Sequence, residues 1–217
     1  MTEHALRTGS GDMPSVRRTD AAAVFVGQLF VPDGQRGTAV LERTAGRWAG
    51  TPWPPSMLSF SCYLSTEQDT VLTYAQSADA DSCRPFVHTL GEAEPWGTVE
   101  YRLRRSVVPS GASGVPGCMV VATFDVDGAE RQDHLIRTLS DALEDMPADR
   151  TAGMLSANFH TATDGTRVLN YAEWTTDEAH TGFLDGAARV TTLRVSGDIP
   201  GVRPIGFKRY HLHRSLG

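Results

Sequence analysis

The spacing of hydrophobic and polar residues alternates between two periods along the chain, and the same order of periods occurs twice. Each half begins with a short apolar run, over residues 23–31 and again over 118–124, which predicts a buried strand. An Asp-Gly pair follows, and after it apolar residues recur at helical spacing. In the second half these residues are Leu135, Ile136, Leu139, Ala142 and Leu143. Each half is therefore expected to begin with a strand and a helix.

Two further strands, a helix and a last strand are expected in each half. A tight turn joins the two strands, and in the second half Asp164-Gly165 forms it, a strong hairpin signal. The second helix is predicted over about 79–90 and about 177–186, and the last strand over about 98–107 and about 203–213. The order β-α-β-β-α-β is that of the ferredoxin-like unit.

The two halves are also related in sequence. Residues 57–87 and 154–184, offset by 97, are identical at nine of 31 positions, whereas ordinary composition gives roughly two by chance. Upstream, an offset of 94 relates residues 30–44 to 124–138. These matches indicate that the chain contains an internal duplication.

The duplication predicts the domain organisation and the fold class. Turn-forming residues between the halves indicate a linker. We expect a flexible N-terminal tail at 1–20, a first domain at 21–107, a linker at 108–116 and a second domain at 117–217. A ferredoxin-like unit covers only one face of its sheet with helices, so two copies can bury their open faces together. The expected fold is α+β, with two tandem ferredoxin-like halves forming an intrachain pseudo-dimeric α+β barrel, as a monomer or a homodimer.

The strands of the second half predict where a pocket lies. With Asp164-Gly165 at the centre of the turn, paired residues have numbers that sum to 329. One face of this hairpin is then almost wholly apolar and carries Leu155, Ala157, Phe159, Val168, Asn170, Ala172 and Trp174. The following helix places His180, Phe183 and Leu184 on one stripe that should face the same sheet.

This arrangement predicts a small polar cluster in an apolar cavity. Asn170, Trp174 and His180 are the candidate catalytic residues. The candidate substrate-binding residues are Leu155, Ala157, Phe159, Ala172, Phe183 and Leu139. A buried Asn or His needs hydrogen-bond partners, and a ligand supplies them where the protein does not. The alternative is that all three polar residues are ordinary core residues.

The first half lacks this polar cluster. At the positions of Asn170, Trp174 and His180 it has Thr73, Ser77 and Cys83. In addition, Phe60 stands where the second half has Ala157, and its ring would fill the space that alanine leaves. The first half therefore resembles a scaffold with a degenerate site, and the second half a functional site.

Charge and composition exclude several classes of partner. The net charge is -6 and basic residues are scattered, so no nucleic-acid surface is expected. Residues 1–20 hold charges, Gly and Ser but no apolar run, so this stretch is expected to be neither a signal peptide nor a membrane anchor. Three cysteines without metal-like spacing predict reduced thiols in a cytoplasmic protein and no metal site. Of the 20 basic residues only Lys208 is lysine, which is typical of GC-rich genomes such as those of actinomycetes.

The segment MLSANFHTATDGTRVLNYAEWTTDEAHTGF resembles the central motif of the antibiotic biosynthesis monooxygenase family, whose Asn-x-x-x-Trp pair is Asn170 and Trp174 here. The resemblance covers most of both halves. It implies oxidation of a phenolic or anthrone-type aromatic polyketide by molecular oxygen, with no metal and no tightly bound cofactor. Two-domain relatives also imply reduced flavin as a cosubstrate, delivered by a separate flavin reductase.

The resemblance assigns roles to the three candidate residues. The reaction needs a base, a donor to a developing oxyanion and a dry cavity. His180, Asn170 and Trp174 would fill these roles, although the anthrone-oxidising members have Tyr where this chain has His180. Two other functions stay open: a non-oxidative polyketide cyclase, and a catalytically silent binding or accessory protein. Haem degradation is disfavoured, because the motif offers no axial ligand except His180.

Overall fold

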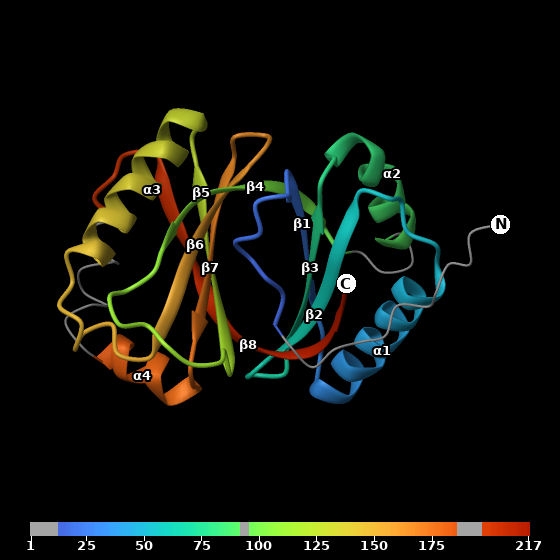
Figure 1. The fold of residues 1–217 in the computed structure, drawn as a ribbon, viewed down its shortest axis with the longest axis horizontal. Coiled ribbons are helices and arrows are strands. Elements are labelled where there is room, and N and C mark those ends of the chain that lie inside the picture. Colours follow the sequence, from blue (N-terminus) through green and yellow to red (C-terminus); the bar gives the residue numbers. More distant parts are fainter. Residues whose placement is uncertain (1–12, 92–95, 186–196) are drawn as a thin grey trace. The chain divides into compact units, whose positions relative to one another are not determined.

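The chain runs twice through the order strand, helix, strand, strand, helix, strand (Figure 1). The computed structural model describes residues 13–91, 96–185 and 197–217. The first six elements are β1 (Ala23–Phe30), α1 (Gly34–Gly50), β2 (Met57–Ser65), β3 (Thr70–Ser77), α2 (Ala80–Gly91) and β4 (Val99–Val107). The second six are β5 (Cys118–Val126), α3 (Ala129–Glu144), β6 (Met154–Ala162), β7 (Arg167–Trp174), α4 (Asp177–Asp185) and β8 (Val202–Leu216). The predicted α+β class and element order are confirmed.

The chain divides into two compact units. Unit 1 contains the residues up to Tyr101 together with Tyr210–Gly217, and unit 2 contains Arg102–Arg209. The strand order is β4-β1-β3-β2-β8 in unit 1 and β8-β5-β7-β6-β4 in unit 2, because β4 and β8 each contribute one part to either unit. The predicted linker at 108–116 therefore falls inside unit 2. The closure of both halves into one pseudo-dimeric barrel stays a prediction.

Residues 13–20 are not a loose tail. Val16 is buried, and the Nε2 amide of buried Gln76 on β3 donates to the backbone oxygens of Ser15 at 3.1 Å and Val16 at 3.4 Å. The predicted flexible tail is thus wrong for this stretch, since the buried amide needs acceptors and finds them here. Residues 1–12 lie outside the described part of the chain.

The β6–β7 hairpin of unit 2 forms around the predicted turn. Gly165 has a φ of 79°, which only glycine adopts without strain, and its N–H donates to Ala162 O at 3.1 Å. Asp164 Oδ1 accepts from both the N–H and the hydroxyl of Thr166, at 2.9 and 2.8 Å. These hydrogen bonds hold the pKa of the Asp164 carboxyl below its ordinary value.

The register of this hairpin follows the predicted pairing for most of its length. Ala157 pairs with Ala172 and Phe159 with Asn170, as the sum of 329 requires. Near the start of β6 the register shifts by one residue, so Met154 lies opposite Trp174. A β-bulge of this kind changes the face to which the neighbouring side chains point.

Helix α3 covers one face of the unit 2 sheet. Gln132 is buried, and its Nε2 amide donates to Ala162 O at 2.9 Å and Arg167 O at 2.8 Å, at the two ends of the hairpin turn. The apolar stripe of the helix then packs into the core with Leu135, Ile136, Leu139 and Leu143. Burial of each such side chain contributes about 1.5–3 kcal/mol. No helix within the described ranges is long and apolar enough to cross a membrane.

Candidate functional site

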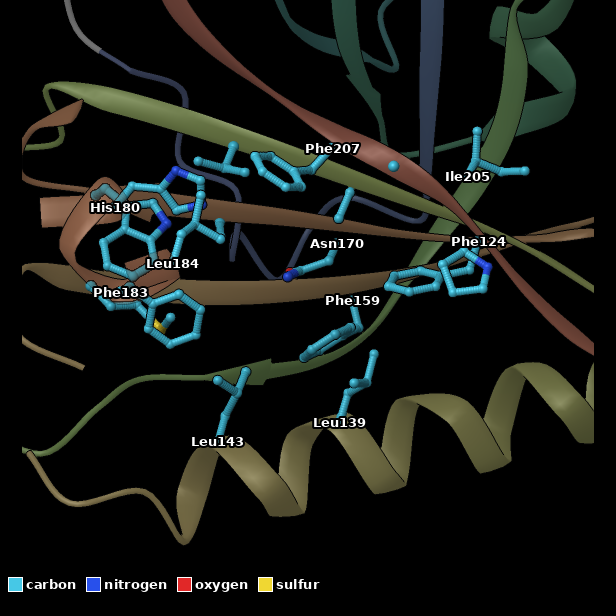
Figure 2. Close-up of a pocket in the computed structure, with 17 residues that line it drawn as sticks. Phe124, Leu139, Leu143, Phe159, Asn170, His180, Phe183, Leu184, Ile205 and Phe207 are labelled. Atoms are coloured by element: carbon cyan, nitrogen blue, oxygen red, sulfur yellow. The ribbon is translucent and has the colours of Figure 1, made fainter. Parts of the chain in front are cut away.

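Unit 2 contains a cavity of about 320 Å³ between its sheet, helices α3 and α4, and the first part of β8 (Figure 2). The sheet contributes Val120, Ala122, Phe124, Met154, Phe159, Asn170, Ala172 and Trp174. The helices contribute Leu139, Leu143, His180, Phe183 and Leu184, and β8 contributes Pro204, Ile205, Gly206 and Phe207. A cavity of this size, with carbon over most of its wall and few polar groups, is typical of a small-molecule site.

The structure brings all three candidate catalytic residues to this cavity. Asn170 and Trp174 come from β7, where they lie four residues apart on the same face of the strand, and His180 comes from α4. Of the predicted substrate-binding residues, Phe159, Ala172, Phe183 and Leu139 also line it. The placement predicted from strand and helix spacing is therefore observed for seven of the nine candidate residues.

Two predicted substrate-binding residues do not line the cavity. The bulge in β6 gives Met154 the place on this face that regular alternation assigned to Leu155, which lines a separate surface pocket with residues 109–113. Ala157 lies on the predicted face but is fully buried in the core of unit 2.

Each of the three polar residues has an unsatisfied atom. Asn170 Oδ1, Trp174 Nε1 and His180 Nδ1 are buried, and within the described part of the chain none has a hydrogen-bond partner. Buried polar atoms are paired in the great majority of cases, and an unpaired one costs about 1–3 kcal/mol. Three such atoms in one cavity indicate that a ligand or ordered water completes their hydrogen bonding.

The opposite face of the same strands satisfies its buried polar groups. Asn158 Nδ2 donates to Ser156 Oγ at 2.7 Å, and Ser156 Oγ donates to a carboxylate oxygen of Glu173 at 2.5 Å. Ser106 Oγ donates to Asn158 Oδ1 at 2.8 Å. His160 is fully buried there with Nδ1 at 3.0 Å from Asn158 O. Of the two faces of β6 and β7, the cavity face is thus the one with unsatisfied polar atoms.

The imidazole of His180 is held neutral. Burial and, to a smaller extent, charge repulsion by Arg209 lower its pKa to about 4, although Asp177 acts in the opposite direction. A neutral imidazole offers one donor and one acceptor. The resemblance requires a base whose pKa lies near working pH, and a pKa of about 4 lies below that range. His180 is therefore better suited to hydrogen bonding with a ligand than to strong proton abstraction.

Aromatic rings fix the polar end of the cavity. The ring of Trp174 lies 5.1 Å from that of His180 and 5.2 Å from that of Phe183, in tilted and edge-on arrangements. On the other side of the imidazole, the Phe207 ring lies 5.4 Å away at an interplanar angle of 81°. Such edge-to-face contacts restrict rotation of the imidazole and hold it beside the indole N–H.

Sequence reasoning missed two parts of the wall. The β5 residues Val120, Ala122 and Phe124 alternate on one face, and their period of two would have placed them beside Ala172 and Asn170, their neighbours in the sheet. The β8 residues 204–207 gave no such signal, since they follow one another without alternation. Leu143 follows Leu139 by one helical turn and was predicted only as a core residue.

Among the residues that the structure describes, no group of three or more His, Cys, Asp or Glu side chains is arranged to hold a metal ion. The three cysteines, Cys62, Cys83 and Cys118, are free and buried. Burial is the main reason that the pKa of the Cys118 thiol is raised, and a hydrogen bond with Asp177 raises it further. This thiol lies beside the polar end of the cavity in its protonated, unreactive form.

Known proteins resemble the chain in fold and, over a short stretch, in sequence. No protein-family model matches it. A stretch of 45 residues, 21% of the chain, is 42% identical to the tetracenomycin-F1 monooxygenase of Streptomyces glaucescens, and the match spans 36% of that relative's length. Among solved structures, an anthrone oxidase-like protein matches with a TM-score of 0.70 at 11% identity, over 91% of this chain and 93% of that one.

A second solved structure, a monooxygenase-like protein from Listeria innocua, matches with a TM-score of 0.51 at 13% identity, over 88% of this chain and 93% of that one. At these identities the structural likeness concerns the fold, and the matched stretch adds a likeness in sequence. Together they confirm the resemblance of the chain to the antibiotic biosynthesis monooxygenase family.

Proposed function

We propose that the chain is a monooxygenase that oxidises a phenolic or anthrone-type aromatic substrate with molecular oxygen, and that the reaction takes place in the unit 2 cavity. One observation carries the proposal: three unsatisfied polar atoms lie in an otherwise apolar cavity, on the Asn-x-x-x-Trp pair Asn170 and Trp174 and on His180. The monooxygenase activity of the Streptomyces glaucescens relative supports the reaction class.

The apolar wall suits a flat aromatic body. The side chains of Phe159, Leu139 and Leu143 lie on one side of the cavity and that of Phe207 on the other (Figure 2). A ring system between them would be desolvated, which strengthens any hydrogen bond at its polar end. The Trp174 N–H can donate to a carbonyl or oxyanion, and Asn170 Oδ1 can accept from a hydroxyl. A substrate with both groups would satisfy both atoms.

The proposed chemistry balances with oxygen alone when the substrate carries a reactive methylene. The methylene loses two hydrogens and gains one oxygen atom as a carbonyl, while the second oxygen atom leaves as water. The first proton passes to water and is used again when the second oxygen atom leaves as water. Its loss places negative charge on the substrate oxygen, where the Trp174 N–H and a His180 N–H would stabilise it. The low pKa of His180 keeps the imidazole neutral, so its N–H can donate a hydrogen bond to the substrate oxygen.

If the substrate is an aromatic ring without such a methylene, hydroxylation needs two more electrons. Reduced flavin from a separate reductase would supply them, as an alternative to the cofactor-independent reaction. In that case a C–H becomes C–OH and the second oxygen atom again leaves as water. The two versions differ in whether oxygen uptake requires reduced flavin.

Oxygen uptake tests the proposal. We would incubate the protein with anthrone-type and phenolic substrates, with and without reduced flavin, and follow uptake together with the mass of the product formed under labelled oxygen. Replacing Asn170 by Ala, Trp174 by Phe or His180 by Ala should lower kcat/KM by tenfold or more, which is about 1.4 kcal/mol in the barrier.

The matched control is Cys83→Ala, at the position in unit 1 that corresponds to His180, and it should leave the rate within twofold of the parent protein. Incorporation of one labelled oxygen atom supports a monooxygenase. Ligand binding without oxygen uptake under any condition would contradict the proposal and favour a cyclase or a binding protein.

A further inference from the structure

The first part of β8 forms the outer wall of the cavity in an unusual way. Four consecutive residues, Pro204–Phe207, all line it, whereas a regular strand would present only alternate residues. Gly206 has a φ of 140°, which residues with a side chain rarely adopt, and this irregularity lays the strand along the cavity. Ile205 is 61% exposed and Phe207 is 45% exposed, so both apolar side chains lie at its opening.

The cavity has a polar end and an apolar end. His180 and Phe207 lie toward one end, Ile205 and Phe124 lie toward the other, and Asn170 lies between them (Figure 2). The unsatisfied atoms of Trp174 and His180 therefore mark one end and that of Asn170 the middle, while the side chains around Ile205 are apolar. A ligand that pairs with the polar end must extend its apolar body toward Ile205.

Unit 1 shows what happens when a larger residue occupies the position of Ile205. The sequence Pro-Trp-Gly-Thr at 95–98 precedes Tyr101 as Pro-Ile-Gly-Phe at 204–207 precedes Tyr210, so Trp96 corresponds to Ile205. The glycine after Trp96, Gly97, also has a positive φ, of 55°. Trp96 is only 4% exposed and belongs to the hydrophobic core of unit 1. At this position a large side chain thus packs inward.

We propose that Ile205 determines the length of the aromatic ligand that unit 2 accepts, because its small side chain leaves the apolar end of the cavity open. The proposal depends on the proposed function only in taking the ligand to be aromatic with a polar group at one end. Exposed apolar side chains at the end of a cavity lose their contact with water when a ligand covers them, which favours ligands long enough to reach them. Phe207 closes the same wall over the polar end.

Binding of two probes that cannot react tests this role. We would measure the affinity of a hydroxynaphthoquinone, with two fused rings, and of a hydroxyanthraquinone, with three, by calorimetry on the full chain. The parent protein should bind both. Ile205→Trp should weaken the three-ring probe by at least tenfold and change the two-ring probe by less than threefold, and Ile205→Ala should weaken neither probe by more than threefold.

Val115→Trp is the matched control, since Val115 is an apolar residue of unit 2 that is 81% exposed and does not line the cavity. It should change neither affinity, and thermal melting would confirm that each variant is folded. An equal loss for both probes in Ile205→Trp, or no loss for either, would overturn the proposal. So would failure of the parent protein to bind either probe. Binding as expected without oxygen uptake would refute the proposed reaction and leave the role of Ile205 intact.

Discussion

Unit 1 and unit 2 share one element order and differ in how they fill the space beneath their first helix. In unit 1 the rings of Trp48 and Phe60 stack at a centroid distance of 4.1 Å with 14° between their planes. The buried positions of α3 follow those of α1 at an offset of 95, so Leu143 of unit 2 takes the position of Trp48, and Ala157 takes that of Phe60. Unit 2 thus has a leucine side chain and a methyl group where unit 1 has an indole and a phenyl ring. The comparison shows that a cavity can arise from a duplicated fold by the loss of aromatic side chains.

The polar ends of the two units differ as well. In unit 1 the residues that replace the polar cluster all have partners. Ser77 Oγ donates to Asp79 O at 2.7 Å, Thr73 Oγ1 lies 3.5 Å from Gly27 O, and Cys83 Sγ lies 3.2 Å from Ser56 Oγ. In unit 2 the corresponding side chains each keep an unsatisfied atom.

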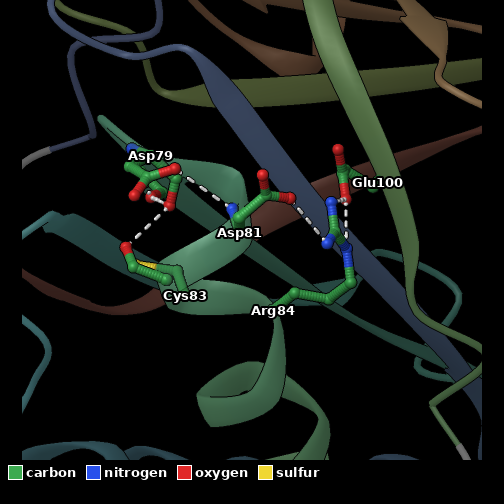
Figure 3. A network of polar contacts seen from close by, with 7 residues as sticks. Asp79, Asp81, Cys83, Arg84 and Glu100 are labelled. Atoms are coloured by element: carbon green, nitrogen blue, oxygen red, sulfur yellow. Dashed lines mark hydrogen bonds and ion pairs between the residues drawn. The ribbon is translucent and has the colours of Figure 1, made fainter.

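The start of α2 in unit 1 is tied down further by charge (Figure 3). Arg84 donates from Nη1 to Asp81 at 2.9 Å and from Nε to Glu100 on β4 at 2.9 Å. Asp79 accepts from the N–H of Asp81 at 3.2 Å. Most of these side chains are exposed, so the ion pairs contribute little to stability, but they leave no charged group unpaired at this corner. This corner of unit 1 is held by hydrogen bonds and ion pairs, whereas the corresponding side chains of unit 2 keep unsatisfied atoms.

Filling the unit 2 cavity with the rings of unit 1 should have the largest effect. The double variant Leu143→Trp/Ala157→Phe places the stacked pair of unit 1 beneath α3. Because the rings would occupy the space of the ligand, affinity for a hydroxyanthraquinone should fall at least a thousandfold, or about 4 kcal/mol, as measured by calorimetry.

Overpacking costs about 1–3 kcal/mol of stability, so circular dichroism should verify the fold, and Ala157→Leu is a milder variant with the same expected direction. A folded double variant that binds the probe like the parent protein would show that the smaller side chains at these two positions do not create the site.

Acid should lower the free energy of unfolding of unit 2. Its buried histidines, His160 and His180, both have a pKa lowered to about 4, mainly by burial, from an ordinary value near 6.5. Between these values the unfolded chain binds more protons than the folded one, so stability falls as the pH falls from about 6.5 to about 4. The loss is about 3 kcal/mol for each histidine, and above this window neither contributes.

Hydrogen exchange of the core amides, followed from pH 7 to pH 4, measures this effect unit by unit. Protection should decrease earlier in β6 and β7 than in β2 and β3, and His160→Gln should remove part of the difference. Equal loss of protection in both units would contradict the assignment of the acid-sensitive groups to unit 2.

The sequence was sufficient to predict the element order and the placement of most of the candidate site residues, for identifiable reasons. The Asp164-Gly165 turn fixes the register of β6 and β7, and the spacing of His180, Phe183 and Leu184 fixes the inner face of α4. The bulge beside Met154 could not be predicted, because nothing in the local sequence distinguishes Met154 from Leu155. The cavity wall on β8 depends on the backbone conformation of Gly206. In such irregular backbone, the spacing of hydrophobic residues does not predict which side chains share a face.

The most direct test of the central claim uses the four tryptophans, of which Trp48, Trp53 and Trp96 lie in unit 1 and Trp174 in unit 2. Each indole Nε1–H gives a separate resonance in a ¹⁵N-labelled protein, and Trp174→Phe assigns the one that matters. Titration with a hydroxyanthraquinone should shift the Trp174 resonance, because its N–H gains an acceptor, and leave the other three in place. Shifts confined to the tryptophans of unit 1 would place the ligand in the wrong unit and contradict the account.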